Sequence, residues 1–247
     1  MKIKKRRRYI GIITGVLIII AMGLIYAYGV YHGYFLLNNP SARTYPVRGV
    51  DVAHYQGEID WPVLAGEGID FAYIKATEGS SHVDRKFADN WAGAEAAELK
   101  IGAYHFFSFD SPGTTQADNF IAQVPDESGI LPPVVDVEYY ADKKVNPPAP
   151  ETVRTELQNM LDELEGHYGR TPVIYTTEDV WEAYLKGHFE DYPLWIRNVF
   201  TGPKIKEEWL IWQYSNRGRL KGYSGVEEFI DLNVFKGTRE EWEQWSQ

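Results

Sequence analysis

The first thirty residues divide into a basic run and a long apolar stretch. Six Lys and Arg residues lie within residues 2–8, and the 21 residues Ile10–Val30 carry no charge. A helix of about 20 apolar residues spans a hydrocarbon core of about 30 Å, and basic flanks remain on the cytoplasmic side. The pattern predicts a basic cytoplasmic tail at 1–9 and a single-pass transmembrane anchor at 10–30. The rest of the chain would then lie on the extracellular, cell wall side of the cell membrane.

A cleaved signal peptide is the alternative interpretation of this stretch. Its apolar core is typically about 7–15 residues long and is followed by a small-x-small cleavage site. Here the core is longer and no clear A-x-A follows, which favours an uncleaved anchor. Residues 31–46 contain Asn, Pro and Ser without apolar periodicity and are interpreted as a short linker. The body of the protein would therefore work close to the membrane.

From residue 47 to 247, short apolar runs alternate with segments of helical periodicity. The runs are rich in β-branched and aromatic residues, as strands are: Gly49–Ala53, Phe71–Ala76, Ile101–Phe107, Pro133–Val137, Pro172–Thr176, Leu194–Arg197, Leu210–Gln213 and Ile230–Val234. Helices are predicted at Arg85–Lys100, Thr114–Val124, Pro150–Tyr168 and Thr177–His188. Eight strands alternating with helices predict an α/β fold, a parallel (β/α) barrel. The intervals after the sixth and seventh strands are too short for regular helices, so the helical ring should be incomplete.

Charge and composition exclude several classes of protein. The chain has a net charge of −10, and without the six basic residues near its N-terminus the remainder carries −16, which excludes binding to a nucleic acid backbone. There is no cysteine, the six histidines are scattered, and no H-E-x-x-H, phosphate-loop, dinucleotide or G-x-S-x-G motif occurs. We therefore expect neither a metal nor a cofactor. His54 and His105 lie near strand ends, where a hydrogen-bonded neutral histidine is the simpler interpretation.

The strongest indication of chemistry is the segment Val134–Glu138. Asp136 and Glu138 stand two residues apart at the end of an apolar run, so in a strand they share a face with Cα atoms roughly 6–7 Å apart. Neighbouring carboxylates repel each other, and a low-dielectric surround raises the pKa of at least one. A carboxylic acid that keeps its proton near neutrality can protonate a glycosidic oxygen. An isolated D-x-E is more often a strand end that continues into a solvated acidic loop, because acids are common at strand ends, so the rest of the chain has to decide.

Further acids fall at other strand ends. Asp51 lies on the first predicted strand, Glu78 just after the second and Asp231 on the eighth. Strands one and eight become neighbours when a barrel closes, so Asp51 and Asp231 should meet, with Asp136 across the mouth. One such acid is adequately explained as a rim residue. Four acids that face one pocket lower the stability of the fold, because charged groups lose their hydration there, and this favours a function for them.

Aromatic side chains accompany these acids. On the predicted strands or just past them lie Tyr55, Tyr104, Phe106, Tyr175, Trp195, Trp212 and Tyr214. Sugars have apolar C–H faces and hydroxyl edges, so aromatic platforms next to Asp, Asn and Gln suit them. Each ring alone could be core; we expect Tyr104, Tyr175 and Trp195 to line the cleft.

Six segments together resemble a known family. They are G-V-D-V-A-H-Y-Q-G at 49–57, Y-I-K-A-T-E-G at 73–79, G-A-Y-H-F at 102–106, V-D-V-E at 135–138, W-Q-Y at 212–214 and I-D-L-N at 230–233. In this order, and over about Val47 to the C-terminus, they are similar to glycoside hydrolase family 25, the Chalaropsis-type lysozymes or N-acetylmuramidases. The resemblance implies a flattened (β/α) barrel with eight strands and an incomplete helical ring.

The resemblance also implies roles for individual residues. Glu138 would be the general acid/base, supported by Asp136, Asp51 and Asp231, and the β-1,4 bond between N-acetylmuramic acid and N-acetylglucosamine would be cleaved with retention. The second step could use an enzyme carboxylate or the substrate's own acetamido oxygen; we favour the acetamido route. Substrate-binding residues are expected at Tyr55, Lys75, Glu78, Tyr104, Phe106, Tyr175, Trp195 and Gln213.

The sequence thus predicts a membrane-anchored peptidoglycan muramidase, a monomer whose partners are peptidoglycan glycan strands and the membrane. Two other functions remain open. A non-catalytic peptidoglycan-binding scaffold would keep the fold and the aromatics but would not need Glu138. A hydrolase of another N-acetylhexosamine polymer, such as chitin, would differ only in how it treats the lactyl group and the peptide stem.

Overall fold

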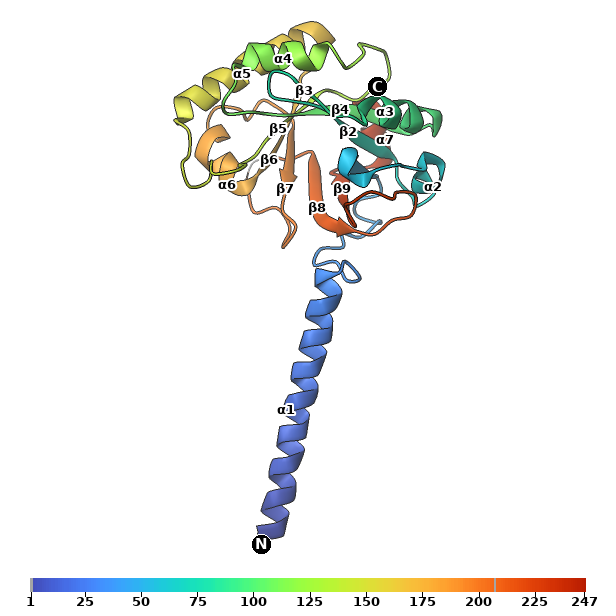
Figure 1. Cartoon of the computed structure of the whole chain (residues 1–247), viewed down its shortest axis with the longest axis vertical. Helices are drawn as coiled ribbons and strands as arrows, with labels where there is room; N and C mark the ends of the chain where they lie inside the picture. Colours follow the sequence, from blue (N-terminus) through green and yellow to red (C-terminus); the bar gives the residue numbers. More distant parts are fainter. Residues whose placement is uncertain (1, 207) are drawn as a thin grey trace.

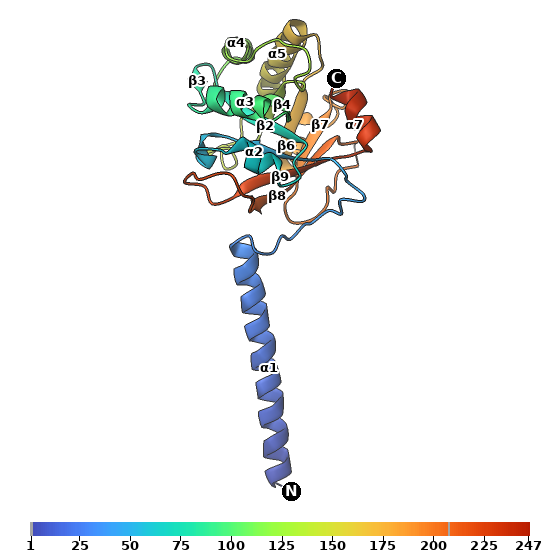
Figure 2. The same ribbon diagram turned by 90° about the vertical axis from the view of Figure 1, so that its right-hand side faces the viewer.

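A barrel carried on one long helix makes up the protein (Figure 1). The computed structural model describes residues 2–206 and 208–247. Helix α1 (Lys2–Tyr31) projects away from the barrel in both views (Figure 2). The side chains of residues 1–6 and 8 lie outside the described part, and they include most of the basic run that predicts the cytoplasmic tail.

Eight strands form the barrel and confirm the eight predicted apolar runs to within a few residues. In chain order they are β1 (Arg48–Val52), β2 (Phe71–Glu78), β4 (Lys100–Phe106), β5 (Val134–Val137), β6 (Val173–Thr177), β7 (Leu194–Arg197), β8 (Ile211–Gly218) and β9 (Ile230–Phe235). Each pairs with its neighbours in this order, and pairing of β1 with both β2 and β9 closes the ring. The two-residue strand β3 (His82–Val83) extends only the end of β2.

One strand corrects the prediction of a parallel barrel. β9 runs antiparallel to both of its neighbours, β1 and β8, whereas the other barrel pairings are parallel. The physical reason is the short interval 219–229, which contains no helix: a hairpin suffices to reverse the chain, while a parallel return needs a crossover of a dozen or more residues. Consequently Asp231, near the start of β9, lies at the carboxyl ends of the other strands.

The helices cover only part of the barrel, as predicted. They are α2 (Trp61–Ala65), α3 (Phe87–Ala96), α4 (Gly113–Ile121), α5 (Pro150–Tyr168), α6 (Glu178–Val180) with the π-helical turn Trp181–Leu185, and α7 (Arg239–Trp245). The bounds of α5 match the prediction, with Pro150 at its first turn and Gly169 left-handed after its end (φ 63°). Helices α3 and α4 are shorter than predicted. Within the described residues, neither the β7–β8 nor the β8–β9 interval contains a helix.

Large aromatic side chains fill the interior of the barrel beneath its carboxyl end. Tyr73 and Trp195 are almost completely buried and their ring centroids lie 5.1 Å apart. The Tyr73 hydroxyl donates to the Pro132 carbonyl at 3.2 Å. Phe71, Tyr73, Val134, Val173, Trp195 and Ile211 belong to one apolar cluster. These side chains fill the lower interior of the barrel, so the pocket among the barrel strands opens toward their carboxyl end.

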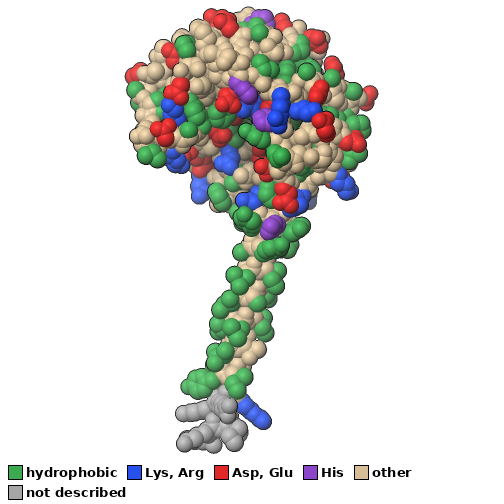
Figure 3. Space-filling model, in the orientation of Figure 1, with side chains coloured by type: hydrophobic (Ala, Val, Ile, Leu, Met, Phe, Trp, Pro, Cys, Tyr) green, Lys and Arg blue, Asp and Glu red, His purple; other side chains and the backbone are tan. Residues whose placement is uncertain are grey.

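Helix α1 and the residues after it lie against this same end of the barrel. The segment Tyr9–Tyr31 is long and apolar enough to cross a membrane, and apolar side chains cover its surface below the barrel (Figure 3). The following residues, predicted as a linker, are folded onto the barrel: Asn38 Nδ2 donates to the carbonyls of Asn198 and Tyr214 at 3.2 and 3.3 Å. The linker is therefore a docked segment and not an extended spacer.

Candidate active site

A pocket of about 540 Å³ opens at the carboxyl end of the barrel. Such ends are where barrels of this type carry their sites. Its lining includes all twelve predicted site residues: Asp51, Tyr55, Lys75, Glu78, Tyr104, Phe106, Asp136, Glu138, Tyr175, Trp195, Gln213 and Asp231. The fold thus brings together all the residues predicted for the site, although the individual roles assigned to them remain predictions; Trp212 and Tyr214, which the sequence placed near strand ends, do not line the pocket.

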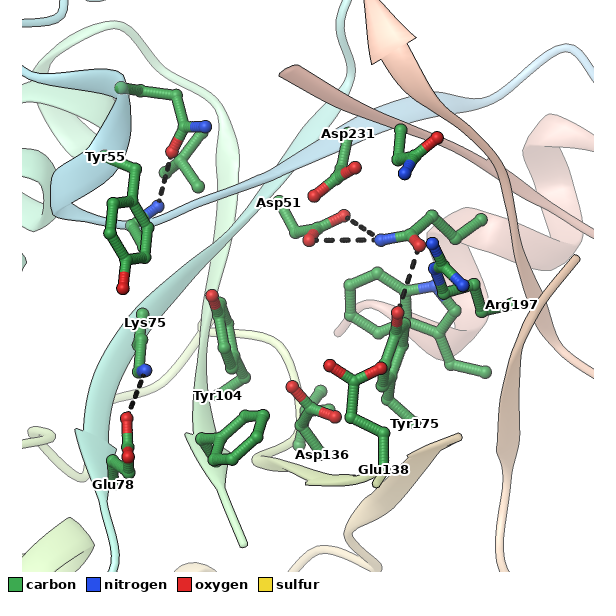
Figure 4. A pocket seen from close by; sticks show the side chains of 18 of the residues that line it. Asp51, Tyr55, Lys75, Glu78, Tyr104, Asp136, Glu138, Tyr175, Arg197 and Asp231 are labelled. Carbon is green, nitrogen blue, oxygen red and sulfur yellow. Dashed lines mark hydrogen bonds and ion pairs between the residues drawn. The ribbon is translucent and has the colours of Figure 1, made fainter. Parts of the chain in front are cut away.

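Four carboxylates face one another across this pocket. Asp136 lies on β5 and Glu138 just past its end, so the period of two puts both on the pocket side. Opposite them, Asp51 on β1 and Asp231 on β9 are register partners, which confirms that strands one and eight bring these acids together. Figure 4 shows the two pairs approaching a common space from opposite sides.

Burial favours the protonated form of all four acids. Burial raises the pKa of Asp136 well above its usual range, and the nearby Glu138 carboxylate raises it further. Burial also raises the pKa of Glu138, an effect that Arg197 partly opposes. The pKa of Asp231 is raised well above its usual range by burial, by the charge of Asp51 and by a hydrogen bond between the two side chains. The same bond lowers the pKa of Asp51, so these effects favour Asp231 as the protonated partner and Asp51 as the acceptor.

Asp51 is held by two amides. Burial raises its pKa, while hydrogen bonds from Asn233 and Gln213 lower it. Asn233 Nδ2 donates to Asp51 Oδ1 at 2.7 Å, and Gln213 Nε2 donates to both carboxylate oxygens at 3.0 and 3.2 Å. Each amide is oriented in turn, because its oxygen accepts from a buried ring: Tyr175 OH to Gln213 Oε1 and Trp195 Nε1 to Asn233 Oδ1, both at 3.0 Å. The four side chains therefore act as a brace that orients the Asp51 carboxylate.

The other side of the pocket carries a cation. Lys75 Nζ forms an ion pair of 2.7 Å with Glu78 and lies 5.0 Å from the centre of the Phe106 ring. In a regular strand, residues three apart point to opposite faces. Here a register shift between Lys75 and Thr77 against β4 changes the alternation, so that Lys75 and Glu78 both face the pocket. The bulge thereby explains the spacing of the K-A-T-E motif.

The aromatic side chains have unequal access to a ligand. Tyr55 at the rim is 51% exposed, whereas Trp195 at the bottom is 1% exposed and Tyr175 is 7% exposed. Tyr175 and Trp195 thus line the cleft as expected, but they act mainly by holding Gln213 and Asn233. The more accessible rings include Phe106 and Tyr140, whose centroids lie 5.6 Å apart in an edge-to-face contact.

Several lining residues were missing from the sequence prediction. Arg197 faces the carboxylates and lowers the pKa of Glu138, Asp136, Asp51 and Asp231. It is the last residue of a predicted strand, so the rule that selected the acids at strand ends would also have found it. Asn233 is buried behind the pocket lining and was part of a quoted motif, but its contact with Asp51 depends on the antiparallel pairing of β9. Tyr140 lies beyond the end of β5 and Asn216 lies within β8, both at positions without any local signal.

Neither histidine near a strand end lines the pocket. His105 is buried, and burial lowers its pKa to about 4, which keeps the ring neutral. Its Nε2 donates to Gln116 Oε1 at 3.0 Å and its Nδ1 accepts from the Thr77 hydroxyl at 2.7 Å. His54 Nδ1 lies 2.7 Å from Asp84 Oδ2. In the part of the chain that the structure describes, no three His, Cys, Asp or Glu side chains are grouped to hold a metal ion.

Comparison with known proteins identifies the family. The family model described as "Glycosyl hydrolases family 25" matches residues 50–223. A family 25 glycosyl hydrolase from Bacillus anthracis is 49% identical with a TM-score of 0.80, over 85% of this chain and 97% of that one. Lysozyme M1 of Streptomyces globisporus is 34% identical over 80% of this chain and 70% of that protein. The N,O-diacetylmuramidase of Chalaropsis sp is 28% identical over 76% of this chain and 95% of that protein. The carboxylate-lined barrel end and these matches agree: this chain belongs to glycosyl hydrolase family 25 and is a glycoside hydrolase of the lysozyme and muramidase type.

Proposed function

We propose that this protein is a membrane-anchored muramidase that hydrolyses the β-1,4 bond between N-acetylmuramic acid and N-acetylglucosamine in peptidoglycan with retention. The observation that carries the proposal is the pair Asp136 and Glu138, two carboxyl groups with raised pKa values on one face of the strand end that enters the pocket. Cleavage of a glycosidic bond requires two carboxyl groups, one that is kept protonated and a second one next to it.

Glu138 is the better general acid of the two. Its side chain is half-buried and reaches into the open part of the pocket, whereas Asp136 is 8% exposed and lies deeper. Burial raises the pKa of Glu138, so it keeps a proton to transfer to the glycosidic oxygen. Arg197, which lowers the same pKa, stabilises the carboxylate that remains after the transfer. Glu138 can thus change between acid and base in successive steps.

Asp136 is suited to the acetamido group of the substrate. Its Oδ1 is buried and has no hydrogen-bond partner among the described residues. In the first step, the acetamido carbonyl oxygen attacks C1 while Glu138 protonates the departing oxygen and the C1–O bond breaks. The amide N–H of the substrate donates to the carboxylate form of Asp136, which the charges of Lys75 and Arg197 favour, and this carboxylate stabilises the positive oxazolinium ring. Asp51 and Asp231 hold the opposite wall in place.

The second step restores both the enzyme and the acetamide. Glu138, now a carboxylate, removes a proton from a water molecule that attacks C1 from the side that the leaving group vacated. The oxazolinium C1–O bond breaks, and the acetamide returns to its original form. Two inversions at C1 give net retention. The acetamido route requires no covalent bond between the sugar and the enzyme. This fits Asp136, whose carboxyl group is buried too deeply to attack C1 itself.

The anchor proposal rests on α1. A helix of this length and apolar composition, preceded by basic residues, would hold the barrel at the outer surface of the cell membrane. Mass analysis of protein extracted from membranes should find residues 2–8 still attached. A soluble product that begins after the apolar stretch would indicate a cleaved signal peptide instead.

Digestion of purified sacculi and chitin side by side tests the activity. Fragments from sacculi should carry N-acetylmuramic acid at their new reducing ends, detectable as muramicitol after borohydride reduction and mass analysis, and chitin should stay intact. Glu138→Gln is the matched control, because it keeps the shape of the side chain and removes the proton. Cleavage of chitin at a similar rate would favour a broader N-acetylhexosaminide hydrolase, and binding to sacculi without cleavage would favour a scaffold.

A further inference from the structure

Two arginines at the end of β8 fix the end of α1 to the barrel: Arg217 lies within the strand and Arg219 directly follows it. The Arg217 guanidinium donates to the Tyr31 carbonyl and lies 5.1 Å from the centres of the Tyr31 and Phe229 rings. Arg219 donates to the His32 carbonyl at 2.5 Å. Cation–π contacts combined with charge-assisted hydrogen bonds hold the last turn of α1 on the β8–β9 hairpin.

The chain after α1 fits this surface in one conformation. Gly33 has a φ of 67°, and a Cβ atom there would lie 2.5 Å from the Arg217 carbonyl oxygen, so only glycine is accommodated. Further along, Asn38 Nδ2 donates to the carbonyls of Asn198 and Tyr214. The position of α1 relative to the mouth of the barrel is therefore built into the fold.

This docking forms a second cavity of about 470 Å³ between the end of α1 and the β7–β8 loop. Arg197 and Asn216 line both this groove and the carboxylate pocket. The groove therefore continues the cleft from the reacting groups toward the end of α1.

The two ends of this continuous cleft differ in chemistry. The carboxylate pocket is acidic, whereas the charged residues of the groove are the cations Arg197 and Arg217. The remaining groove wall is mainly apolar, with Val30, Phe35, Leu36, Leu37, Val199 and Phe200. Phe200 is 73% exposed, although it belongs to this wall. A ligand that matches the whole cleft has a sugar at one end, an anionic group next to it and an apolar chain beyond.

We propose that the groove binds the polyprenyl diphosphate end of a glycan strand that is still attached to its lipid carrier. The inference rests on the proposed muramidase function and on the anchoring of α1. The groove adjoins the last turn of the apolar stretch Tyr9–Tyr31. The anchor would therefore hold it at the outer surface of the cell membrane, where the phosphates of such a lipid lie. The guanidinium groups would face the diphosphate and the apolar wall the first isoprene units. The enzyme would then act on strands at the membrane, close to the lipid-bearing end.

The test uses the full-length protein in vesicles of neutral phospholipid. Two substrates are compared, glycan strands attached to polyprenyl diphosphate and the same strands after mild acid has released the lipid. Because sharing a membrane raises the local concentration of a lipid-linked strand, the decisive quantity is how variants change the ratio of the two kcat/KM values. Phe200→Ser and Arg217→Gln should lower this ratio about tenfold and leave the rate on released strands unchanged. Val226→Ser, at a residue that is 90% exposed and outside the groove, is the matched control and should leave the ratio unchanged.

Each other outcome is informative. A ratio that is equal in the wild type, Phe200→Ser and Val226→Ser would overturn the lipid-carrier site while leaving the muramidase function intact. Loss of the preference when anionic phospholipid is added would assign the groove to a phospholipid headgroup and overturn the proposal as well. If neither form of the strand is cleaved, the proposed function itself fails. A selective loss in both groove variants supports the site.

Discussion

Replacing Tyr175 by Phe tests whether the brace around Asp51 matters for catalysis. Tyr175→Phe removes one buried hydroxyl and nothing else from the pocket. That hydroxyl is the donor to Gln213 Oε1, and it orients the amide so that Nε2 faces both oxygens of Asp51. Without it the amide can rotate by 180° and turn its carbonyl oxygen toward the carboxylate. The substitution would therefore act on Asp51 through Gln213.

The expected magnitudes follow from the burial of these groups. An unsatisfied buried acceptor costs about 1–3 kcal/mol, and Gln213 is only 2% exposed, so the free energy of unfolding should fall by about that amount. A hydrogen bond to a charged group contributes about 1.5–3 kcal/mol, and its loss at Asp51 should lower kcat by about 10- to 100-fold. Because the Gln213 bond lowers the pKa of Asp51, the acidic limb of the pH–rate profile should move to higher pH.

The assay is the release of reducing ends from sacculi over a pH series, together with thermal unfolding of each variant. Tyr73→Phe is the matched control: its hydroxyl is also buried and bonded, to the Pro132 carbonyl, but it lies below the pocket. Tyr73→Phe should lower the free energy of unfolding about as much as Tyr175→Phe does, but it should leave the pH–rate profile unchanged. If Tyr175→Phe kept wild-type kcat and profile while losing stability as Tyr73→Phe does, the brace would have no catalytic role and the argument would be refuted.

Four further outcomes are expected at the carboxylates. Glu138→Gln should lower kcat on sacculi by about 10²- to 10⁴-fold without loss of fold, and near-normal activity would exclude it as the general acid. Asp136→Asn should also lose most of its activity, and a thiazoline analogue of the oxazolinium intermediate should inhibit the wild type. A fluorinated substrate should leave no covalent adduct that mass spectrometry can detect, and an adduct on Asp136 would refute the acetamido route. Asp231→Asn should retain far more activity than Asp51→Asn, because an amide can still donate to Asp51, and equal losses would show that Asp231 does not act as a donor. Finally, because the carboxyl pKa values are raised in the folded state, the folded chain binds more protons than the unfolded chain above about pH 4. The free energy of unfolding should therefore fall as pH rises, by about 1.4 kcal/mol per pH unit for each such proton. Denaturant unfolding should show that the stability of Asp136→Asn increases relative to the wild type with increasing pH, and a constant difference between the two would contradict this.

Local signals in the sequence determined the elements of this fold. The β-branched runs predicted all eight barrel strands, and the helix Pro150–Tyr168 was predicted with its observed bounds because Pro and Gly mark its ends. Strand-end acids and the segments around them located all twelve predicted site residues on one pocket. These predictions succeeded because apolar periodicity and end signals depend on residues that are close in sequence.

Only the tertiary structure decided which of these residues act on one another. The reversal of β9 places Asn233 against Asp51, and the bulge in β2 turns Lys75 and Glu78 to the same side. Docking of the last turn of α1 on Arg217 forms the groove beside the cleft. Each depends on strand direction, register or a contact between residues far apart in the chain. Such features reflect the closing of the barrel and the packing of side chains, and no local pattern of hydrophobic and polar residues records them.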